Sequence, residues 1–147
     1  MRKPISWDEL WIKMAQLVAQ RSKDPNTQVG CVLVSPDQRR IAIGYNGFAA
    51  GIKENDERWS RPTKYDYVIH AEENSLINRG TENVVGWTAY LTMPPCHHCT
   101  SKLIQAGIKR VIWLKDPSST AFNYDLSYKL LTEANITFGK YREEYDA

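Results

Sequence analysis

The chain lacks most of the features that mark specialised protein classes. It has three cysteines in 147 residues, too few for a disulfide framework, and its 19 Lys and Arg nearly balance its 17 Asp and Glu. No stretch approaches the ~20 consecutive apolar residues of a membrane span, and no internal repeat or low-complexity segment is visible. The sequence therefore predicts neither a disulfide-stapled scaffold, nor a membrane protein, nor a repeat array.

The near balance of charge also bears on binding partners. A net charge of +2 argues against a large nucleic-acid footprint, which a clustered basic face would provide. A small anionic ligand, by contrast, needs only two or three local cations. No apolar run of signal-peptide length follows the residues Met1 to Pro4. We therefore expect a cytoplasmic protein that binds a small molecule and no membrane.

Composition and periodicity predict one α/β domain spanning residues 1–147. With 42% hydrophobic residues, the chain can bury a core of its own. Helices are predicted at residues 6–21, where Ser6 and Glu9 form a capping box, and at residues 70–80, 96–106 and 125–134. Strands are predicted at residues 29–34, 40–45, 87–92, 111–114 and 136–138.

The order of these elements predicts the fold. The first two strands form a hairpin, and helices and strands alternate after it, which is typical of a mixed sheet covered on both faces. We predict a three-layer α/β/α sandwich with a mixed five-stranded sheet. Residues 47–67 are polar and irregular, and we expect them to form a long loop that is functional or disordered.

Two short segments carry the candidate chemistry. His70-Ala71-Glu72 is followed, 26 positions after the histidine, by Cys96-His97-His98-Cys99, which Pro94-Pro95 precede. One imidazole and two thiolates suit Zn²⁺, and three protein ligands leave a fourth tetrahedral position open. The sequence therefore predicts a catalytic zinc held by His70, Cys96 and Cys99.

Glu72 lies two residues from the predicted histidine ligand. It is too close to be an easy fourth ligand on the same helical turn, but it is well placed to reach a water on the metal, so we predict an acid/base role. The pattern H-x-E with a later P-C-x-x-C is the signature of the zinc nucleobase deaminases.

Other interpretations of these residues remain. The two cysteines could be half of a structural zinc site, but the remaining Cys31 lies in an apolar run and is predicted to be a buried strand residue. A thioredoxin-like redox pair would leave His70 and Glu72 without a role. We expect His97 and His98 to point away from the metal, with a separate metal site as the alternative.

The resemblance extends beyond the zinc motif, over roughly residues 6 to 140. The matching segments are Arg21-Ser22-Lys23-Asp24-Pro25-Asn26-Thr27-Gln28-Val29-Gly30, Gly44-Tyr45-Asn46-Gly47, His70-Ala71-Glu72, Pro95-Cys96 to Cys99, and Gln105-Ala106-Gly107-Ile108. Together they resemble the deoxycytidylate (dCMP) deaminase family. The zinc motif is shared with cytidine, guanine, riboflavin-pathway and tRNA adenosine deaminases, whereas the Ser-Lys-Asp-Pro-Asn and Gly-Tyr-Asn-Gly segments favour dCMP.

The resemblance implies a reaction and a substrate site. The reaction would be the zinc-dependent hydrolysis of dCMP to dUMP and ammonia, which feeds dTMP synthesis, with Glu72 carrying the proton. Asn46 would contact the sugar, the backbone of Ala71 would hold the base carbonyl, and Tyr124 could stack on or hydrogen-bond to the substrate. Candidates for the 5′-phosphate are Ser22, Lys23, Asn26, Arg58, Arg61 and Lys64.

The resemblance also implies regulation. Family members of this type are hexamers that dCTP activates and dTTP inhibits, and Mg²⁺ could accompany the triphosphate. A triphosphate site near the Gly-Tyr-Asn-Gly turn would involve Tyr45, Asn46, Gly47, Arg58 and Lys64.

Two further hypotheses differ from this one. Another base deaminase, acting on tRNA adenosine or on a free nucleoside or base, should have a more basic surface than this chain, whose tail at residues 140–147 is acidic. A non-catalytic nucleotide-binding module with a structural zinc should have four closed ligands and no turnover.

Overall fold

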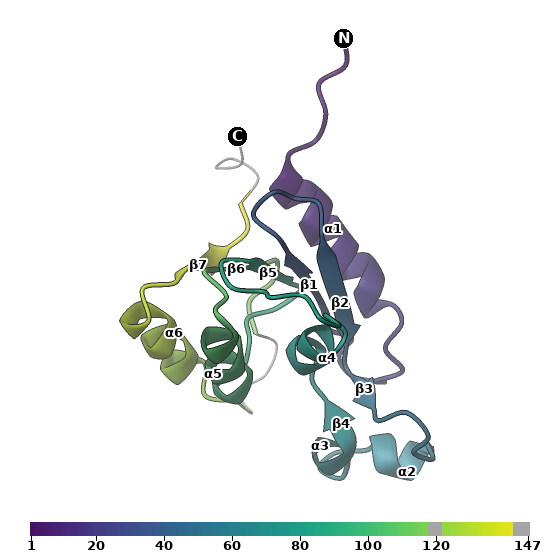
Figure 1. Ribbon diagram of the computed structural model, residues 1–147. Helices are drawn as coiled ribbons and strands as arrows, with labels where there is room; N and C mark the ends of the chain where they lie inside the picture. The colour runs from purple at the N-terminus through teal and green to yellow at the C-terminus, as the bar shows by residue number, and fades with distance from the viewer. Residues whose placement is uncertain (118–121, 143–147) are drawn as a thin grey trace.

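The computed structural model describes residues 1–117 and 122–142, and its centre is a five-stranded sheet (Figure 1). The strand order across the sheet is β2-β1-β5-β6-β7. The bounds of these strands are Gly30–Val34 for β1, Ile41–Tyr45 for β2, Thr88–Leu91 for β5, Arg110–Trp113 for β6 and Thr137–Lys140 for β7. Strand β1 is antiparallel to β2 and β5, whereas β5, β6 and β7 are mutually parallel. The predicted mixed five-stranded α/β fold is confirmed.

Helix α1 (Trp7–Ala19) covers one face of the sheet. Ser6 caps its start, because the Ser6 hydroxyl accepts a hydrogen bond from the Glu9 backbone N–H at 3.0 Å. The buried side of the helix packs on Val32, Val34 and Tyr90. The helix lies very close to β1, since a Cβ atom at Gly30 would stand 2.0 Å from the Ala15 carbonyl oxygen.

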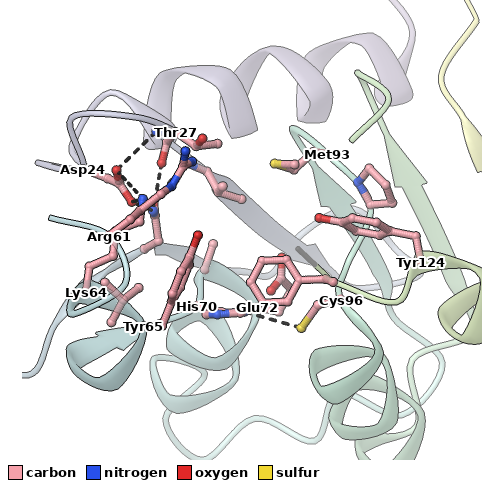
Figure 2. A pocket seen from close by; sticks show the side chains of 16 residues that line it. Asp24, Thr27, Arg61, Lys64, Tyr65, His70, Glu72, Met93, Cys96 and Tyr124 are labelled. Atoms are coloured by element: carbon pink, nitrogen blue, oxygen red, sulfur yellow. Dashed lines mark hydrogen bonds and ion pairs between the residues drawn. The ribbon is translucent and has the colours of Figure 1, made fainter. Parts of the chain in front are cut away.

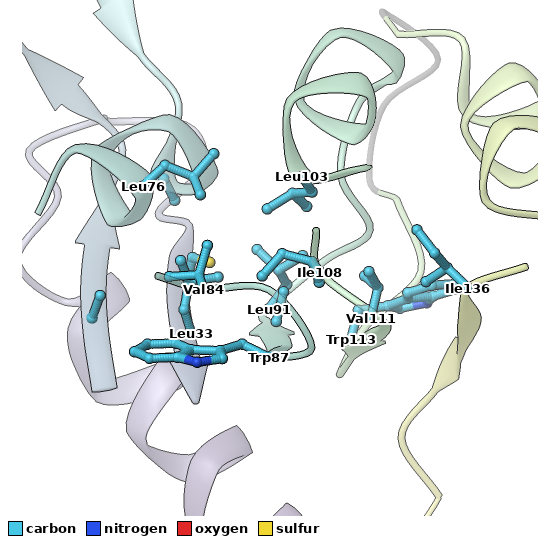
Figure 3. Packing of buried hydrophobic residues seen from close by; sticks show 14 of the residues in the cluster. Leu33, Leu76, Val84, Trp87, Leu91, Leu103, Ile108, Val111, Trp113 and Ile136 are labelled. Atoms are coloured by element: carbon cyan, nitrogen blue, oxygen red, sulfur yellow. The ribbon is translucent and has the colours of Figure 1, made fainter. Parts of the chain in front are cut away.

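Helices α4 (Ala71–Ile77), α5 (His97–Ala106) and α6 (Tyr124–Glu133) lie on the other face. The main core fills the space between these helices and the sheet, where Leu33, Leu91, Leu103, Ile108 and Val111 are buried (Figure 3). Burying such side chains is the main favourable contribution to folding.

Helix α4 is pressed against the edge strand β2. A Cβ atom at Gly44 would stand 2.3 Å from the Ser75 backbone nitrogen and 2.5 Å from the Ala71 carbonyl oxygen. Only glycine allows this approach, so any side chain at position 44 would push away the helix that begins next to His70.

Residues 47–67 are not the long loop that the sequence predicted. They contain strand β3 (Gly47–Phe48) and the short helices α2 (Asp56–Trp59) and α3 (Lys64–Tyr67), and β3 pairs with β4 (Val68–Ile69). We call residues 47–69 the insert. Phe48 stacks on Trp59 at 4.4 Å and on Tyr67 at 5.3 Å between ring centroids. These three aromatic residues have no regular spacing, so sequence periodicity did not reveal the small core that they form.

Smaller differences concern the ends of elements. The last strand runs over Thr137–Lys140 rather than residues 136–138, and α4 ends at Ile77 with Asn78 as its C-cap, so Gly80 lies in the turn that follows. None of the helices in residues 1–117 and 122–142 has the length and apolar character that a membrane crossing requires.

Candidate active site and metal centre

Three side chains predicted to bind metal meet between the starts of two helices. His70 is the N-cap residue of α4 and Cys96 is the N-cap residue of α5, while Cys99 lies in the first turn of α5. His70 Nδ1 lies 3.5 Å from Cys96 Sγ and 3.3 Å from Cys99 Sγ. All three ligand atoms lie within 4.8 Å of one another, close enough to coordinate one ion.

The start of α5 suits negatively charged sulfur. The Cys99 backbone N–H donates to Cys96 Sγ at 3.5 Å, and helix N-termini favour anions. A hydrogen bond from the Cys99 thiol, followed by the contact with His70, lowers the pKa of Cys96 to about 4. The hydrogen bond to Cys96 raises the pKa of His70 to about 9. A metal ion that binds here replaces these shared protons.

The donor set fits zinc. One imidazole nitrogen and two thiol sulfurs are ligands that Zn²⁺ prefers, and the potential metal-binding group within the described residues has these three members and no fourth. His97 and His98 lie outside the group, with their rings 4.0 Å apart between centroids. A three-ligand set corresponds to an open, catalytic site rather than to a closed structural one.

Cys31 is also outside the metal-binding group, as its apolar surroundings in the sequence suggested. It is fully buried in β1, and the Ser75 hydroxyl lies 3.2 Å from its sulfur. Burial raises the pKa of the Cys31 thiol, which keeps it protonated.

Glu72 lies beside the metal-binding group with only 4% of its surface exposed. Burial raises the pKa of this carboxyl group above its usual range. Glu72 lines the same pocket as His70 and Cys96, so a molecule in the pocket can contact all three. A buried carboxyl group of raised pKa can both accept and return a proton near neutral pH.

The pocket has two chemically different ends (Figure 2). Its metal end contains His70, Glu72 and Cys96, whereas Asp24, Lys64 and Arg61 gather at the end that we call the anion end. The remaining lining residues are Thr27, Val29, Asn46, Tyr65, Val68, Ala71, Met93, Pro94, Phe122 and Tyr124.

The predicted substrate residues divide into two groups. Asn46, Ala71 and Tyr124 line the pocket, whereas Ser22, Lys23 and Asn26 do not. The buried Ser22 hydroxyl donates to the Asn46 carbonyl oxygen at 2.8 Å. Lys23 is exposed and pairs with Glu54 at 2.6 Å.

Asn46 is held by its own side-chain hydrogen bonds. Its amide oxygen accepts from the Val29 backbone N–H at 2.8 Å, and its amide nitrogen donates to the Thr27 carbonyl at 3.0 Å and to Asp24 at 3.3 Å. The residue therefore presents one fixed orientation to the pocket.

The predicted regulatory residues lie in different settings. Tyr45 lies under the Arg21 guanidinium at 5.9 Å, and Gly47 pairs with Ile69 in the insert. Arg58 lies over the Tyr67 ring at 4.8 Å. Lys64 belongs to the pocket itself: it is buried, and both of its distances to the Asp24 carboxylate oxygens are 3.0 Å.

Sequence reasoning assigned no site role to several of the pocket residues, among them Asp24, Tyr65, Met93 and Phe122. Phe122 meets His70 edge-on at 5.5 Å and Tyr65 at 6.2 Å between ring centroids. The sequence could have indicated Asp24 as a structured residue, because Asp-Pro-Asn favours a turn in which the aspartate accepts backbone hydrogen bonds. The other three residues carry no comparable local pattern.

Comparisons with known proteins agree with this geometry. A family model described as the cytidine and deoxycytidylate deaminase zinc-binding region matches residues 5–115. Human deoxycytidylate deaminase is 38% identical over 143 residues, which cover 93% of this chain and 80% of that protein. The deoxycytidylate deaminase of Mycobacterium phage D29 is 36% identical over 129 residues, covering 79% of this chain and 99% of that one.

A solved structure is similar over most of the chain. The crystal structure of dCMP deaminase from the cyanophage S-TIM5, in complex with dCMP and dUMP, superposes with a TM-score of 0.74 at 26% sequence identity. The match covers 90% of this chain and 95% of that chain.

The fold, the three-ligand group and the buried Glu72 define a zinc-binding deaminase domain. The chain belongs to the cytidine and deoxycytidylate deaminase family, and it is an enzyme.

Proposed function

We propose that the protein catalyses the zinc-dependent hydrolytic deamination of dCMP to dUMP and ammonia. The observation that carries this proposal is a pocket that is lined at one end by the buried Glu72 and the metal-binding residues His70 and Cys96, and at the anion end by Arg61. Two further findings support the choice of substrate: relatives at 36–38% identity are named deoxycytidylate deaminases, and the S-TIM5 structure contains dCMP and dUMP.

The two ends of the pocket define how dCMP would lie. The cytosine ring faces Glu72, and the 5′-phosphate faces the anion end. Arg61 lines this end and has no hydrogen-bond or ion-pair partner within the described residues. A guanidinium matches the geometry of a phosphate and forms charge-assisted hydrogen bonds with it. Arg61 is therefore the proposed phosphate ligand.

Glu72 carries the protons of the reaction. Zinc, when bound by His70, Cys96 and Cys99, supplies a Lewis acid that lowers the pKa of the attacking water. Glu72 accepts the proton of this water and delivers it to N3 of the cytosine, which makes C4 more electrophilic. After the water oxygen has added to C4, Glu72 takes the remaining proton of that oxygen and gives it to the amino group, which leaves as ammonia while the C4 carbonyl forms. The raised pKa of Glu72, which burial causes, favours this double role.

Neighbouring groups orient the base. The backbone N–H of Ala71, at the start of α4, is proposed to donate to the base carbonyl, and Asn46 to contact the sugar. Burial raises the pKa of Tyr124 to about 12, so its hydroxyl stays protonated and can donate a hydrogen bond.

We extend the proposal to regulation: dCTP activates and dTTP inhibits, with Mg²⁺ accompanying the triphosphate in a homo-hexamer. The insert supports this hypothesis because it contains Arg58 and also supplies Arg61, Lys64 and Tyr65 to the pocket wall. An effector that moved the insert would act on the anion end.

The test is ammonia release from zinc-loaded protein offered dCMP, deoxycytidine, CMP and cytidine, each with and without dCTP and Mg²⁺. Turnover confined to dCMP supports the substrate, and a rise with dCTP supports the regulation. Activity on none of them overturns the substrate, and RNA adenosine and free bases are then tested. An unchanged dCMP saturation curve with dCTP and dTTP overturns the regulatory part alone.

A further inference from the structure

A buried ion pair at the anion end of the pocket has no part in the chemistry described so far. Lys64 is 4% exposed and Asp24 is 8% exposed, and the two are joined by two 3.0 Å contacts. Lys64 belongs to helix α3 of the insert, whereas Asp24 lies in the turn before β1, 40 positions earlier. A buried ion pair is weak evidence that the two residues are there to stabilise the fold, because removing both charges from water is costly. The position of this pair in the pocket wall is therefore the more informative observation.

The hydrogen bonds of Lys64 leave it no free donor. Its ammonium group has three N–H bonds, and its partners are the two Asp24 oxygens and the Asn26 amide oxygen at 3.3 Å. A substrate phosphate could bind this ammonium only by displacing Asp24 or Asn26, and Asn26 does not line the pocket. Displacing Asp24, which does line the pocket, would leave a buried carboxylate without its counter-ion, which is costly.

Asp24 connects the pair to the sugar-binding candidate. Its carboxylate accepts from the backbone N–H groups of Asn26 at 2.8 Å and Thr27 at 3.2 Å, and from the Asn46 amide at 3.3 Å. The Asp24 carboxylate therefore connects three parts of the chain by hydrogen bonds: the turn before β1, Asn46 just before the insert, and Lys64 near the end of the insert.

The charges explain why the pair is needed. Asp24 is an anion in the wall where the phosphate of a nucleotide would lie, and an unpaired carboxylate there would repel it. Lys64 cancels that charge, so Arg61 is the cation that remains at this end among the residues lining the pocket. We propose that Lys64 is a positioning residue, which neutralises Asp24 and holds the insert in place but does not bind the phosphate itself. This inference rests on the proposed function, because it assumes a nucleotide substrate.

The test compares ligands with and without a phosphate. The variants are Lys64→Met, the double variant Asp24→Asn with Lys64→Met, and the conservative Lys64→Arg. The control is Lys13→Met, which removes an exposed lysine that pairs with Glu9 of the same helix α1 and does not line the pocket. For each protein, kcat and KM for dCMP and the inhibition constants of dUMP and deoxyuridine are measured at the same pH. Zinc content and melting temperature report on folding.

The expected pattern is specific. Lys64→Met raises KM for dCMP and the inhibition constant of dUMP by about tenfold or more, because an unpaired carboxylate then faces the phosphate. The same variant changes kcat and the inhibition constant of deoxyuridine, which has no phosphate, by less than about threefold. The double variant, which has no charge at either position, restores dUMP inhibition to within about threefold of the original protein. Lys64→Arg keeps the charge and stays near the original values.

Two results would overturn the inference. If Lys64→Met weakens the binding of dUMP and the binding of deoxyuridine equally, the ion pair between Lys64 and Asp24 is purely structural. A double variant that binds dUMP as poorly as Lys64→Met would mean that Lys64 is itself a phosphate ligand. An original protein that neither turns over dCMP nor binds dUMP removes the proposed function and this inference together, so the two failures are distinguishable.

Discussion

The two ends of the pocket are built in different ways. The metal end comes from two short sequence segments, each with a recognisable motif at the start of a helix, and the fold brings them together across 26 to 29 positions. The anion end joins the turn at Asp24 with the insert residues Arg61 and Lys64, about 40 positions away. Each half of the metal end is thus marked by a local sequence motif, whereas no local motif marks the contacts of the anion end, which would select the substrate.

Removing the metal should have the largest effect on turnover, and it should affect only the metal end of the pocket. Chelation is expected to reduce turnover below detection, because the metal activates the attacking water, and added Zn²⁺ should restore it. Ammonia release measured against zinc content checks this. Full activity in metal-free protein would contradict a catalytic zinc at His70, Cys96 and Cys99.

Glu72→Gln should separate proton transfer from metal binding. We expect kcat to fall by about 10²–10⁴, because the amide cannot carry the proton, while zinc content and KM stay close to those of the original protein. The control is Glu82→Gln, which loses an exposed carboxylate that pairs with Arg40. Turnover within threefold of the original would rule out the acid/base role.

The difference between the two ends also explains what the sequence could predict. The metal end was predictable from the spacing of His70, Glu72, Cys96 and Cys99, because these residues belong to short motifs at helix starts. Periodicity likewise indicated the five strands and four of the helices. The anion end was only partly predictable: Lys64 was a phosphate candidate, but its burial against Asp24 depends on how the insert folds back. That folding depends on the stacking of Phe48, Trp59 and Tyr67, which no local pattern reveals.

Arg61→Gln should act on the anion end and spare the metal end. A charge-assisted hydrogen bond is worth about 1.5–3 kcal/mol, so KM for dCMP should rise by roughly 10–100-fold with kcat changed by less than about threefold. Lys53→Gln is a matched control, because it removes an exposed positive charge of the insert that does not line the pocket. Equal effects of both variants would indicate general electrostatic attraction instead of a specific contact.

Phe48→Ala should loosen the insert without disturbing the metal. Phe48 is half-buried between Trp59 and Tyr67, so we expect a loss of about 1–3 kcal/mol of stability, below the range for a fully buried phenylalanine. Because the insert supplies Arg61 and Lys64, KM for dCMP should rise several-fold, with zinc content unchanged. Denaturant unfolding and steady-state kinetics measure the two effects. Loss of zinc from this variant would show that the two ends are not independent.

The smallest effect concerns a region away from the pocket, the ion pair between Asp8 of α1 and Arg110 of β6. Arg110 donates two hydrogen bonds to the Asp8 carboxylate, at 2.8 and 2.6 Å, and these lower the pKa of Asp8 below its usual value near 4. The stability that the pair contributes is therefore present above about pH 4 and is lost as pH falls through the lowered pKa.

Asp8→Asn should cost about 1 kcal/mol at neutral pH, since both side chains are partly exposed, and the two proteins should converge in stability in strong acid. Activity at neutral pH should not change, because neither residue lines the pocket. A constant difference in the free energy of unfolding between neutral and strongly acidic pH would mean that the ion pair does not cause the effect.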